Sequence, residues 1–252
     1  GFRENGITIE NKPFEATLEV PVSWMRRDKT GQIQVRIDDM ARRAVNHWGS
    51  LLSPLINNGE TGICYDGQYF FDTDHAEGDS GTQSNDLTVD ISTVPAAVRG
   101  TPTAPSAEEV REMVLSGVQQ IIGFKDDQGE PMNEMAREFL VQVPTGYFRA
   151  AAAALNNPIM GGGDTNIMTN LDGFNFSLAV NPRLTWTDKL AVFRTDGPAA
   201  PFIQQEEEGV KVASIAEGSE LEFNQDMHHH GISAWRNVGY GYWQDACLVQ
   251  AT

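Results

Sequence analysis

Residues 14–24, FEATLEVPVSW, alternate strictly between apolar and polar side chains. A period of two predicts a β-strand with one buried face. The apolar face consists of Phe14, Ala16, Leu18, Val20, Val22 and Trp24. A shorter strand at Ile7 and Ile9 comes before it, and the intervening turn residues ENKP favour a hairpin over roughly residues 5–25. Pro21 suits an edge strand, because proline donates no backbone hydrogen bond.

A different period follows this strand. Apolar residues recur every three or four positions, which predicts an amphipathic helix over about residues 33–56. They are Ile33, Ile37, Met40, Ala44, Trp48, Leu51, Leu52 and Leu55. Gly49 and Pro54 are expected to bend this helix or to end it early. The sequence therefore opens with a hairpin and one long helix.

The next part of the chain is mostly loop until a second helix begins. Residues 76–105 are rich in Gly, Ser, Thr and Pro, which predicts an extended loop with one short strand at 87–91. Ser106 is expected to begin the helix, because its hydroxyl can cap the backbone while Glu109 reaches back. The buried face of this helix extends to Ile122.

The second half of the chain mixes strands with one further helix. FLVQV at 139–143 predicts a buried strand, and the alanine-rich YFRAAAAAL predicts a closely packed helix after it. Strand patterns recur at 174–181, 184–194 and 210–215, and the segment 221–249 is strand-rich. Its aromatic residues are expected to be structural and not a ligand platform; they are Trp235, Tyr240, Tyr242 and Trp243. The order of elements predicts an α+β fold.

Composition narrows the range of functions. The 252 residues are 40% hydrophobic, which is ordinary for a globular core, and no run approaches the ~20 apolar residues of a membrane span. The net charge of −17 disfavours general nucleic-acid binding, because phosphate contacts require clustered Lys and Arg. Cys64 and Cys247 form neither a metal-ligand spacing nor a disulfide framework, which favours an intracellular origin. Position 1 is Gly, so we expect the chain to begin inside its reading frame.

The charge is unevenly distributed along the chain. Residues 1–43 hold eight Lys and Arg against seven Asp and Glu, a balance of +1 that leaves −18 for the remainder. Arg26, Arg27 and Lys29 gather at the base of the predicted hairpin. This basic cluster is therefore an exception on a strongly acidic chain.

The stretch YDGQYFFDTDH contains the candidate chemistry. Asp72, Asp74 and His75 could converge as the ligands of a metal-dependent hydrolase if the stretch formed a turn. No HExxH sequence and no second cluster with ligand spacing accompany them. The structural alternative is that Asp66 and Gly67 form a tight turn, while Asp72 and Asp74 cap or brace the loop that follows.

Other polar clusters carry weaker signals. In a strand, His228 and His230 would share one face and His229 would point away, which favours a strand-edge or interface role. GGGD at 161–164 lacks the strand–loop–helix setting of a phosphate-binding loop. Neither cysteine has a histidine near it in sequence, and no GxSxG is present, so no catalytic nucleophile is predicted.

Taken together, these stretches resemble the major head subunit of Mu-like phages and prophages. The resemblance covers nearly the whole length, in FEATLEVPVSWMRRD, CYDGQYFFDTDHAEGDSGTQSN, FLVQVP with its alanine-rich helix, LAVNPRLTWTDKLAVF and HHHGISAWRNVGYGYWQDACLV. YDGQYFFDTDH with the Gly/Ser-rich loop after it is the most specific part. In that family the stretch is a capsid element with no catalytic site attached, so the resemblance implies a structural role for Asp72, Asp74 and His75.

The resemblance implies an α+β fold of the Johnson type, which tailed-phage and herpesvirus shells share. Transferred to this chain, it implies four parts. They are an extended-loop hairpin (1–31), a peripheral domain with a spine helix (32–122), an axial domain (123–221) and C-terminal return strands of the peripheral domain (222–252). No arm or scaffolding segment precedes residue 1 in this sequence, which leaves maturation cleavage open.

The implied function is that of a major capsid protein, with no enzymatic activity, catalytic residue, cofactor or metal. It would self-assemble in the host cytoplasm into an icosahedral shell that encloses double-stranded DNA, and would reside in the virion. The expected partners are its own copies in pentamers and hexamers, a portal, a scaffolding protein or maturation protease, a decoration protein, and DNA held without sequence-specific contacts; no membrane is expected. Two alternatives stay open, an encapsulin-like nanocompartment shell and the metal-dependent hydrolase.

The apolar face of the predicted hairpin needs a neighbour, because a two-stranded ribbon is marginally stable in water. Residues 5–28 are therefore expected to extend away from their own subunit's core and to pack on an adjacent subunit. The expected contact residues are Phe14, Leu18, Val20, Val22, Trp24, Arg26 and Arg27. The two arginines are expected to meet acidic surface on that neighbour, which would offset the repulsion between acidic subunits.

Overall fold

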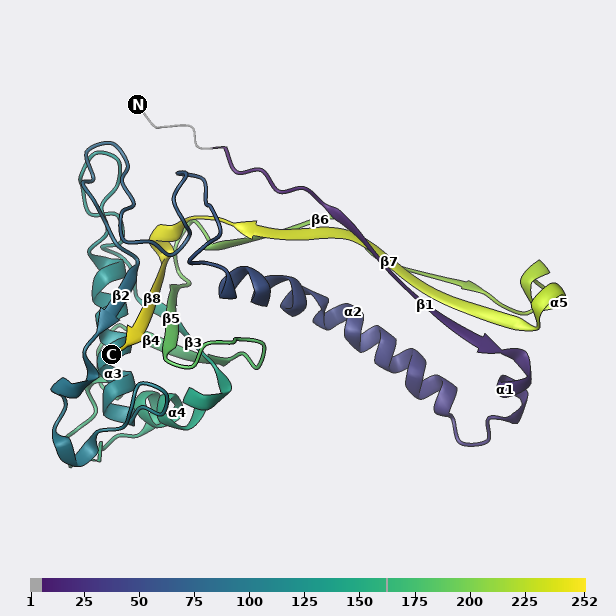
Figure 1. Ribbon diagram of the computed structural model, residues 1–252, viewed down its shortest axis with the longest axis horizontal. Helices are drawn as coiled ribbons and strands as arrows, with labels where there is room; N and C mark the ends of the chain where they lie inside the picture. Colours follow the sequence, from purple (N-terminus) through teal and green to yellow (C-terminus); the bar gives the residue numbers. More distant parts are fainter. Residues whose placement is uncertain (1–5, 162) are drawn as a thin grey trace. The chain divides into compact units, whose positions relative to one another are not determined.

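The computed structural model describes residues 6–161 and 163–252. Residue 5 of the predicted hairpin and Gly162 of the GGGD loop lie outside this range. The chain divides into two compact units, whose elements are drawn in Figure 1. Among the described residues, unit 1 consists of 6–7, 53–161, 163–203 and 240–252, and unit 2 consists of 8–52 and 204–239. Three of the four boundaries fall inside one long helix and two long strands, and the boundary between residues 7 and 8 lies outside any helix or strand.

A five-stranded mixed sheet forms the centre of unit 1. Its strand order is β2-β8-β5-β3-β4. The strands are β2 (Asp86–Val89), β3 (Glu138–Val143), β4 (Asn175–Val180), β5 (Lys189–Arg194) and β8 (Ala246–Ala251). The central strand β5 runs antiparallel to both β3 and β8, whereas the outer strands β2 and β4 run parallel to their neighbours. The three inner strands consist mainly of buried residues, as their apolar runs predict.

Helix α3 (Ala107–Ile122) packs on this sheet and beside α4 (Phe148–Asn156). The predicted capping box at its start is confirmed. The hydroxyl of Ser106 accepts a hydrogen bond from the Glu109 N–H, and the Glu109 carboxylate accepts one from the Ser106 N–H at 2.7 Å. These bonds satisfy backbone donors that the first turn of a helix leaves unpaired.

Gly117 permits the close approach of α3 to the sheet. A Cβ atom at this position would lie 3.0 Å from the Val192 side chain and 3.1 Å from that of Val249, which are tight contacts with β5 and β8. Short 3₁₀ helices complete the described chain. They are η1 (Ile91–Thr93), η2 (Ala96–Val98), η3 (Thr145–Tyr147), η4 (Ile167–Thr169) and η5 (Trp243–Asp245).

Unit 2 is built on a three-stranded sheet of order β1-β7-β6. The strands are β1 (Lys12–Pro21), β6 (Phe202–Ile215) and β7 (Met227–Tyr240), and the helices are α1 (Val22–Arg27), α2 (Gln32–Asn57) and α5 (Glu220–Gln225). The helices α1 and α5 meet at one end of the sheet (Figure 1), where the Val22 N–H donates to the Asp226 carbonyl at 2.9 Å. The part of α2 that belongs to unit 2 contacts β1 and β7 through side chains described below.

The predicted hairpin over residues 5–25 is wrong in its pairing. β1 pairs antiparallel with β7, so that Pro21 lies opposite Met227, and residues 6–11 form no strand. The strand also ends at Pro21, where α1 begins, and does not continue to Trp24. The alternation thus marks a strand whose partner lies about 200 residues further along the chain. β1 therefore pairs within its own chain, in unit 2, and the packing of this segment on an adjacent subunit stays a prediction.

Other differences from the predictions concern the ends of elements. α2 continues through Gly49 and Pro54 to Asn57 and does not end early. β5 begins at Lys189, later than the predicted strand at 184–194, because residues before it form turns. β6 begins at Phe202, well before the predicted strand at 210–215. The predicted strand at 139–143 and the alanine-rich helix are confirmed as β3 and α4.

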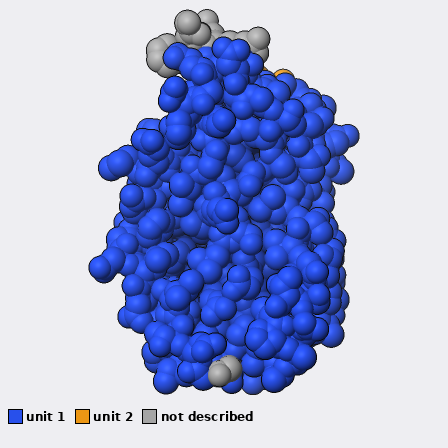
Figure 2. Space-filling model, turned by 90° about the vertical axis from the view of Figure 1, so that its left-hand side faces the viewer, with its two compact units in different colours: residues 1–7, 53–203, 240–252 blue, residues 8–52, 204–239 orange. Residues whose placement is uncertain are grey.

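The hydrophobic core lies in unit 1. Its largest fully buried side chains include Phe70, Phe71, Phe124, Phe139 and Trp243. Figure 2 shows one outer face of this unit, in blue. None of the helices in the described ranges has the length and apolar character needed to cross a membrane.

Candidate functional site

The stretch YDGQYFFDTDH forms a tight turn followed by a buried loop in unit 1. Gly67 has a φ angle of 89°, which favours glycine, and its N–H donates to the Cys64 carbonyl at 3.1 Å. A β-bridge between Ile63 and Tyr69 closes the turn. The predicted tight turn at Asp66 and Gly67 is therefore confirmed.

His75 is fully buried at the end of this stretch. Its Nδ1 lies 2.6 Å from Asp66 Oδ2, and its Nε2 lies 3.3 Å from Asn85 Oδ1. The NH₂ group of Asn85 donates to the carbonyls of Phe70 and Trp243, which orients the amide oxygen toward the histidine. Both ring nitrogens thus face side-chain oxygen atoms. The ring also stacks on the Trp243 indole, with centroids 4.0 Å apart and planes 9° apart.

Cys64 completes the cluster. Its thiol donates to Asp66 Oδ1 at 2.9 Å, so the two oxygens of one carboxylate hold Cys64 and His75. Burial, with this hydrogen bond, raises the pKa of the Cys64 thiol to about 12, which keeps the thiol protonated at neutral pH. Burial alone would raise the pKa of the Asp66 carboxyl, but hydrogen bonds from His75 and Cys64 hold that pKa below its ordinary value.

Among the described residues, one group of potential metal ligands lies close together: Cys64, Asp66 and His75. One ligand atom from each lies within 4.8 Å of the other two. A zinc ion would require the thiolate form of Cys64, whereas here the thiol is a hydrogen-bond donor and both Asp66 oxygens are occupied. The geometry is that of a satisfied structural network. The sequence pattern missed this network, because the turn brings Cys64 to a histidine eleven residues away.

Asp72, Asp74 and His75, the alternative ligand set, do not come together as a group of metal ligands in the described ranges. The Asp72 carboxylate accepts hydrogen bonds from the N–H groups of Tyr69 and Thr73, at 3.1 and 2.7 Å, and thereby braces the loop. Asp74 is exposed, and a hydrogen bond with Asp72 raises its pKa. The cluster that forms around His75 leaves out both carboxylates.

The three consecutive histidines lie in β7 of unit 2. His228 is buried, with Nε2 3.4 Å from Glu222 Oε1, and His229 Nε2 lies 3.7 Å from Glu19 Oε1. The cluster of potential metal ligands found in the described chain does not include these histidines. An interface role for them stays a prediction.

The seven residues predicted to contact another subunit occupy different environments in unit 2. They are Phe14, Leu18, Val20, Val22, Trp24, Arg26 and Arg27. Val20 and Val22 are buried within the chain, and Phe14 and Leu18 are half-buried. Trp24 is 65% exposed, and both arginines are exposed. A contact with another subunit stays a prediction, and the exposed three are the residues able to make it without rearrangement.

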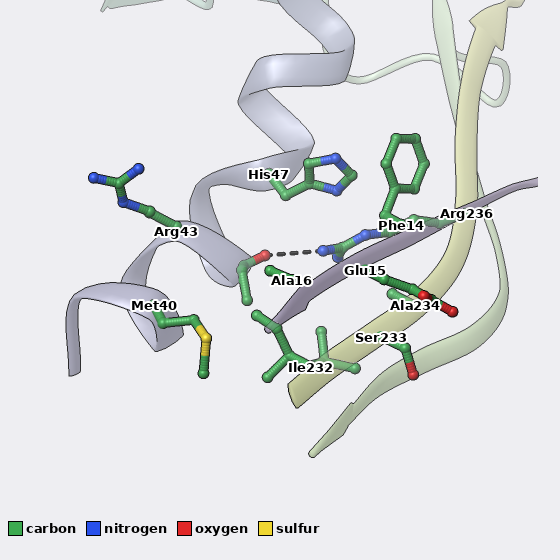
Figure 3. Close-up of a pocket in the computed structure, with 12 residues that line it drawn as sticks. Phe14, Glu15, Ala16, Met40, Arg43, His47, Ile232, Ser233, Ala234 and Arg236 are labelled. Carbon is green, nitrogen blue, oxygen red and sulfur yellow. Dashed lines mark hydrogen bonds between the residues drawn. The ribbon is translucent and has the colours of Figure 1, made fainter. Parts of the chain in front are cut away.

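A pocket of about 220 Å³ lies between α2 and the sheet of unit 2 (Figure 3). Most of its lining is apolar: Phe14, Ala16, Met40, Ala44, Val210, Ile232 and Ala234. Arg236 and His47 add polar atoms. The guanidinium of Arg236 donates to the Ala44 carbonyl at 2.9 Å and lies 4.8 Å from the Trp48 ring, while Phe14 packs on the His47 ring at 4.3 Å. Sequence reasoning missed this pocket because it draws residues from β1, α2, β6 and β7.

Residues 1–95 match the model of the family described as Mu-like prophage major head subunit gpT. The Mu-like prophage FluMu major head subunit of Haemophilus influenzae is 31% identical over 88 residues, which cover 35% of this chain and 29% of that relative. The major capsid protein of Escherichia phage Mu is 35% identical over 71 residues, which cover 28% of this chain and 23% of that relative. The matched stretches thus cover less than a third of either relative.

Solved capsid structures resemble the fold over nearly the whole chain. The bacteriophage JBD30 capsid matches with a TM-score of 0.50 at 14% identity, covering 95% of this chain and 49% of that chain. The capsid of the cyanophage P-SCSP1u matches with a TM-score of 0.56 at 10% identity, covering 100% of this chain and 78% of that chain. At such identities the likeness shows the fold alone. The first 95 residues are therefore similar in sequence to Mu-like major head subunits, and the chain has the α+β fold of tailed-phage capsid proteins.

Proposed function

We propose that the chain is a major capsid protein that self-assembles into an icosahedral shell around double-stranded viral DNA. The proposal rests on two similarities found in the same chain. Residues 1–95 resemble head subunits in sequence, and nearly the whole chain resembles capsid proteins in fold. The protein would be part of the virion and would have a structural role without catalysis. The satisfied network at His75 supports this role, because it leaves no open ligand position.

The surface of unit 2 supports self-assembly. Trp24, Val45, Val212 and Phe223 are each more than 60% exposed, although all four are large apolar side chains. Burial against other copies of the chain would remove these side chains from water. The net charge of −17 also suits a container, because an acidic lumen repels packaged phosphate.

The remaining partners are proposed from the likeness to Mu-like head subunits. Copies of the chain would form pentamers and hexamers, and a portal, a scaffolding protein or maturation protease, and a decoration protein would complete the particle. The four-part division at residues 31, 122 and 221 stays a prediction. Unit 2 draws residues from all four of those parts, since it joins 8–52 to 204–239.

Negative-stain electron microscopy of the purified 252-residue chain tests the proposal. Closed shells or capsomer rings are expected, and the ratio of nucleic acid to protein in particles from the natural source is expected to show packaged DNA. Particles filled with a protein cargo would indicate a nanocompartment shell in place of a virus head. A chain that stays monomeric at every concentration would contradict the proposal.

A further inference from the structure

Phe223 projects into solvent from the end of unit 2. It lies on α5 and is 91% exposed. The helix around it is ordered by hydrogen bonds, because Ser219 accepts from the Glu222 N–H at its start and Asp226, in the left-handed region with φ of 53°, ends it. Phe223 is therefore held outward on a defined turn.

Acidic side chains flank this ring. Glu220 precedes Phe223 by three residues, a spacing that places both on one helix face, and Asp226 follows by three. Both acids are exposed, and neither carboxylate has a hydrogen bond or ion pair with another described residue. The end of unit 2 thus presents an aromatic ring beside unpaired negative charge.

The pocket between α2 and the sheet has complementary properties (Figure 3). Its volume of about 220 Å³ exceeds the roughly 150 Å³ of an apolar cavity that holds benzene. Met40, at one side, has a flexible thioether that packs well against aromatic rings. A phenylalanine side chain therefore fits the pocket in size and polarity.

Two nitrogen atoms at the pocket lack hydrogen-bond partners among the described residues. Arg236 is only 4% exposed, and its Nε is buried without a hydrogen-bond partner among the described residues; the same holds for Nδ1 of His47. The Glu206 carboxylate lies 3.8 Å from Nη1 of Arg236 and does not reach Nε. A buried donor without an acceptor destabilises a fold, so a carboxylate arriving with the ring would be favourable.

The ring cannot reach the pocket of its own chain. α5 is followed directly by β7, which starts at Met227, whereas the pocket is lined by β7 residues from Ile232 to Arg236. Five to nine strand residues correspond to roughly 17–30 Å at ~3.4 Å per residue. Only a second copy of the chain brings such a ring to the pocket.

We propose that Phe223 of one copy inserts into the α2–sheet pocket of a second copy, where Glu220 or Asp226 accepts a hydrogen bond from Arg236 Nε. The inference rests on the proposed self-assembly and names one of its contacts. If each copy donates its Phe223 to the next copy, the contact is heterologous, and a rotation that closes on itself gives a ring of subunits. Each contact also places negative charge against a cation, which reduces repulsion between acidic copies.

Chemical cross-linking between two variants of the chain, each with one introduced cysteine, tests the contact. One chain carries Asn224→Cys beside the intact Phe223, and the other carries Arg43→Cys at the rim of the pocket. A short bismaleimide is expected to join the two chains in a mixture. The native Cys64 and Cys247 stay unreactive, because both are buried and burial raises the pKa of each thiol.

Adding Phe223→Ala to the first chain is expected to reduce the cross-linked product at least tenfold. Adding Ala16→Phe to the second chain, which fills the pocket, is expected to have the same effect. Val212→Ala serves as the matched control, because Val212 is 76% exposed in the same unit and lies outside the pocket lining. The melting temperatures of all variants are measured to show that each chain folds.

A cross-link that persists when Phe223 is removed overturns the inference. So does the absence of any cross-link between folded chains. Shells that form by microscopy without a Phe223-dependent cross-link would leave the proposed function standing while the inference fails. A Phe223-dependent cross-link in a chain that forms no shell would support the contact and count against the capsid function.

Discussion

Unit 1 and unit 2 bury apolar surface to very different extents. Unit 1 encloses large aromatic side chains, including Trp243 and four phenylalanines, within its own sheet and helices. Among the described residues of unit 2, the buried apolar side chains are Val20, Val22, Ala234 and Val238. Because a three-stranded sheet with one long helix and two short ones has little interior of its own, we infer that unit 1 stabilises the subunit and that the proposed assembly buries unit 2 against other copies.

The largest expected effect on unfolding comes from the core of unit 1. Trp243→Ala should lower the free energy of unfolding by roughly 3–5 kcal/mol, because it removes a fully buried ring and leaves a cavity against His75 and Phe124. Thermal or denaturant unfolding measures the change. Trp24→Ala, at an exposed position in unit 2, is the control. An equal decrease in the free energy of unfolding for both substitutions would contradict the difference proposed between the two units.

The next effect comes from the network at His75. Asp66→Asn should cost roughly 1–3 kcal/mol, because the amide replaces one of the two carboxylate oxygens that hold Cys64 and the buried His75. Asp74→Asn, in the same loop but exposed, should change the free energy of unfolding by less than about 0.5 kcal/mol. Denaturant titration compares the two variants at pH 7. If Asp66→Asn were as mild as Asp74→Asn, the network would not contribute to the stability of unit 1.

A smaller, pH-dependent effect is expected at Asp86, at the start of β2. Burial, with the nearby Glu60 carboxylate, raises the pKa of Asp86 to about 6. A raised carboxyl pKa means that folding favours the protonated form, so the subunit loses stability as pH rises from about 4 to 6. Asp86→Asn should therefore stabilise the protein at pH 8, by about 1 kcal/mol after allowance for solvent screening at this half-buried group.

Melting curves of the wild type and Asp86→Asn at pH 4 and pH 8 check this prediction. The two proteins should melt alike at pH 4, where both side chains are uncharged. A difference that is as large at pH 4 as at pH 8 would show that the substitution acts through packing and not through the titration of Asp86.

The smallest effect on unfolding is expected from the basic residues of α1. Replacing Arg26 and Arg27 by Glu should leave the melting temperature nearly unchanged, because exposed charges contribute only about 0–1 kcal/mol each. Assembly should be abolished or strongly slowed, because a weak contact repeated at every interface is amplified. Light scattering at low and moderate salt follows assembly, and Arg26→Lys with Arg27→Lys is the charge-preserving control. Normal assembly of the Glu variant at both salt levels would refute the predicted contact.

The elements that the sequence predicted well are those stabilised by local interactions. The capping box at Ser106 and the buried run at 139–143 are encoded within a few residues, and both are confirmed. The partner of β1 is not encoded locally, since Lys12 pairs with Arg236, and alternation specifies a face but not a neighbour. The predicted hairpin failed for that reason.

The candidate site shows the same limit. Asp66 and Gly67 were predictable as a turn, because that dipeptide favours the required backbone conformation. The bond between Cys64 and Asp66 and the stacking of His75 on Trp243 depend on how the turn folds back and on a residue far along the chain. The pocket of unit 2 is lined by residues from four elements, and no sequence pattern within a single element predicts it.

Hydrogen exchange in free subunits and in assembled particles tests the central claim most directly. The amides of β3, β5 and β8 in unit 1 are predicted to exchange slowly in both states, because its core is complete in the single chain. The amides of β1 and β7 in unit 2 are predicted to exchange faster in the free subunit and to gain protection on assembly. Equal protection of unit 2 in both states, or a gain confined to unit 1, would contradict the account.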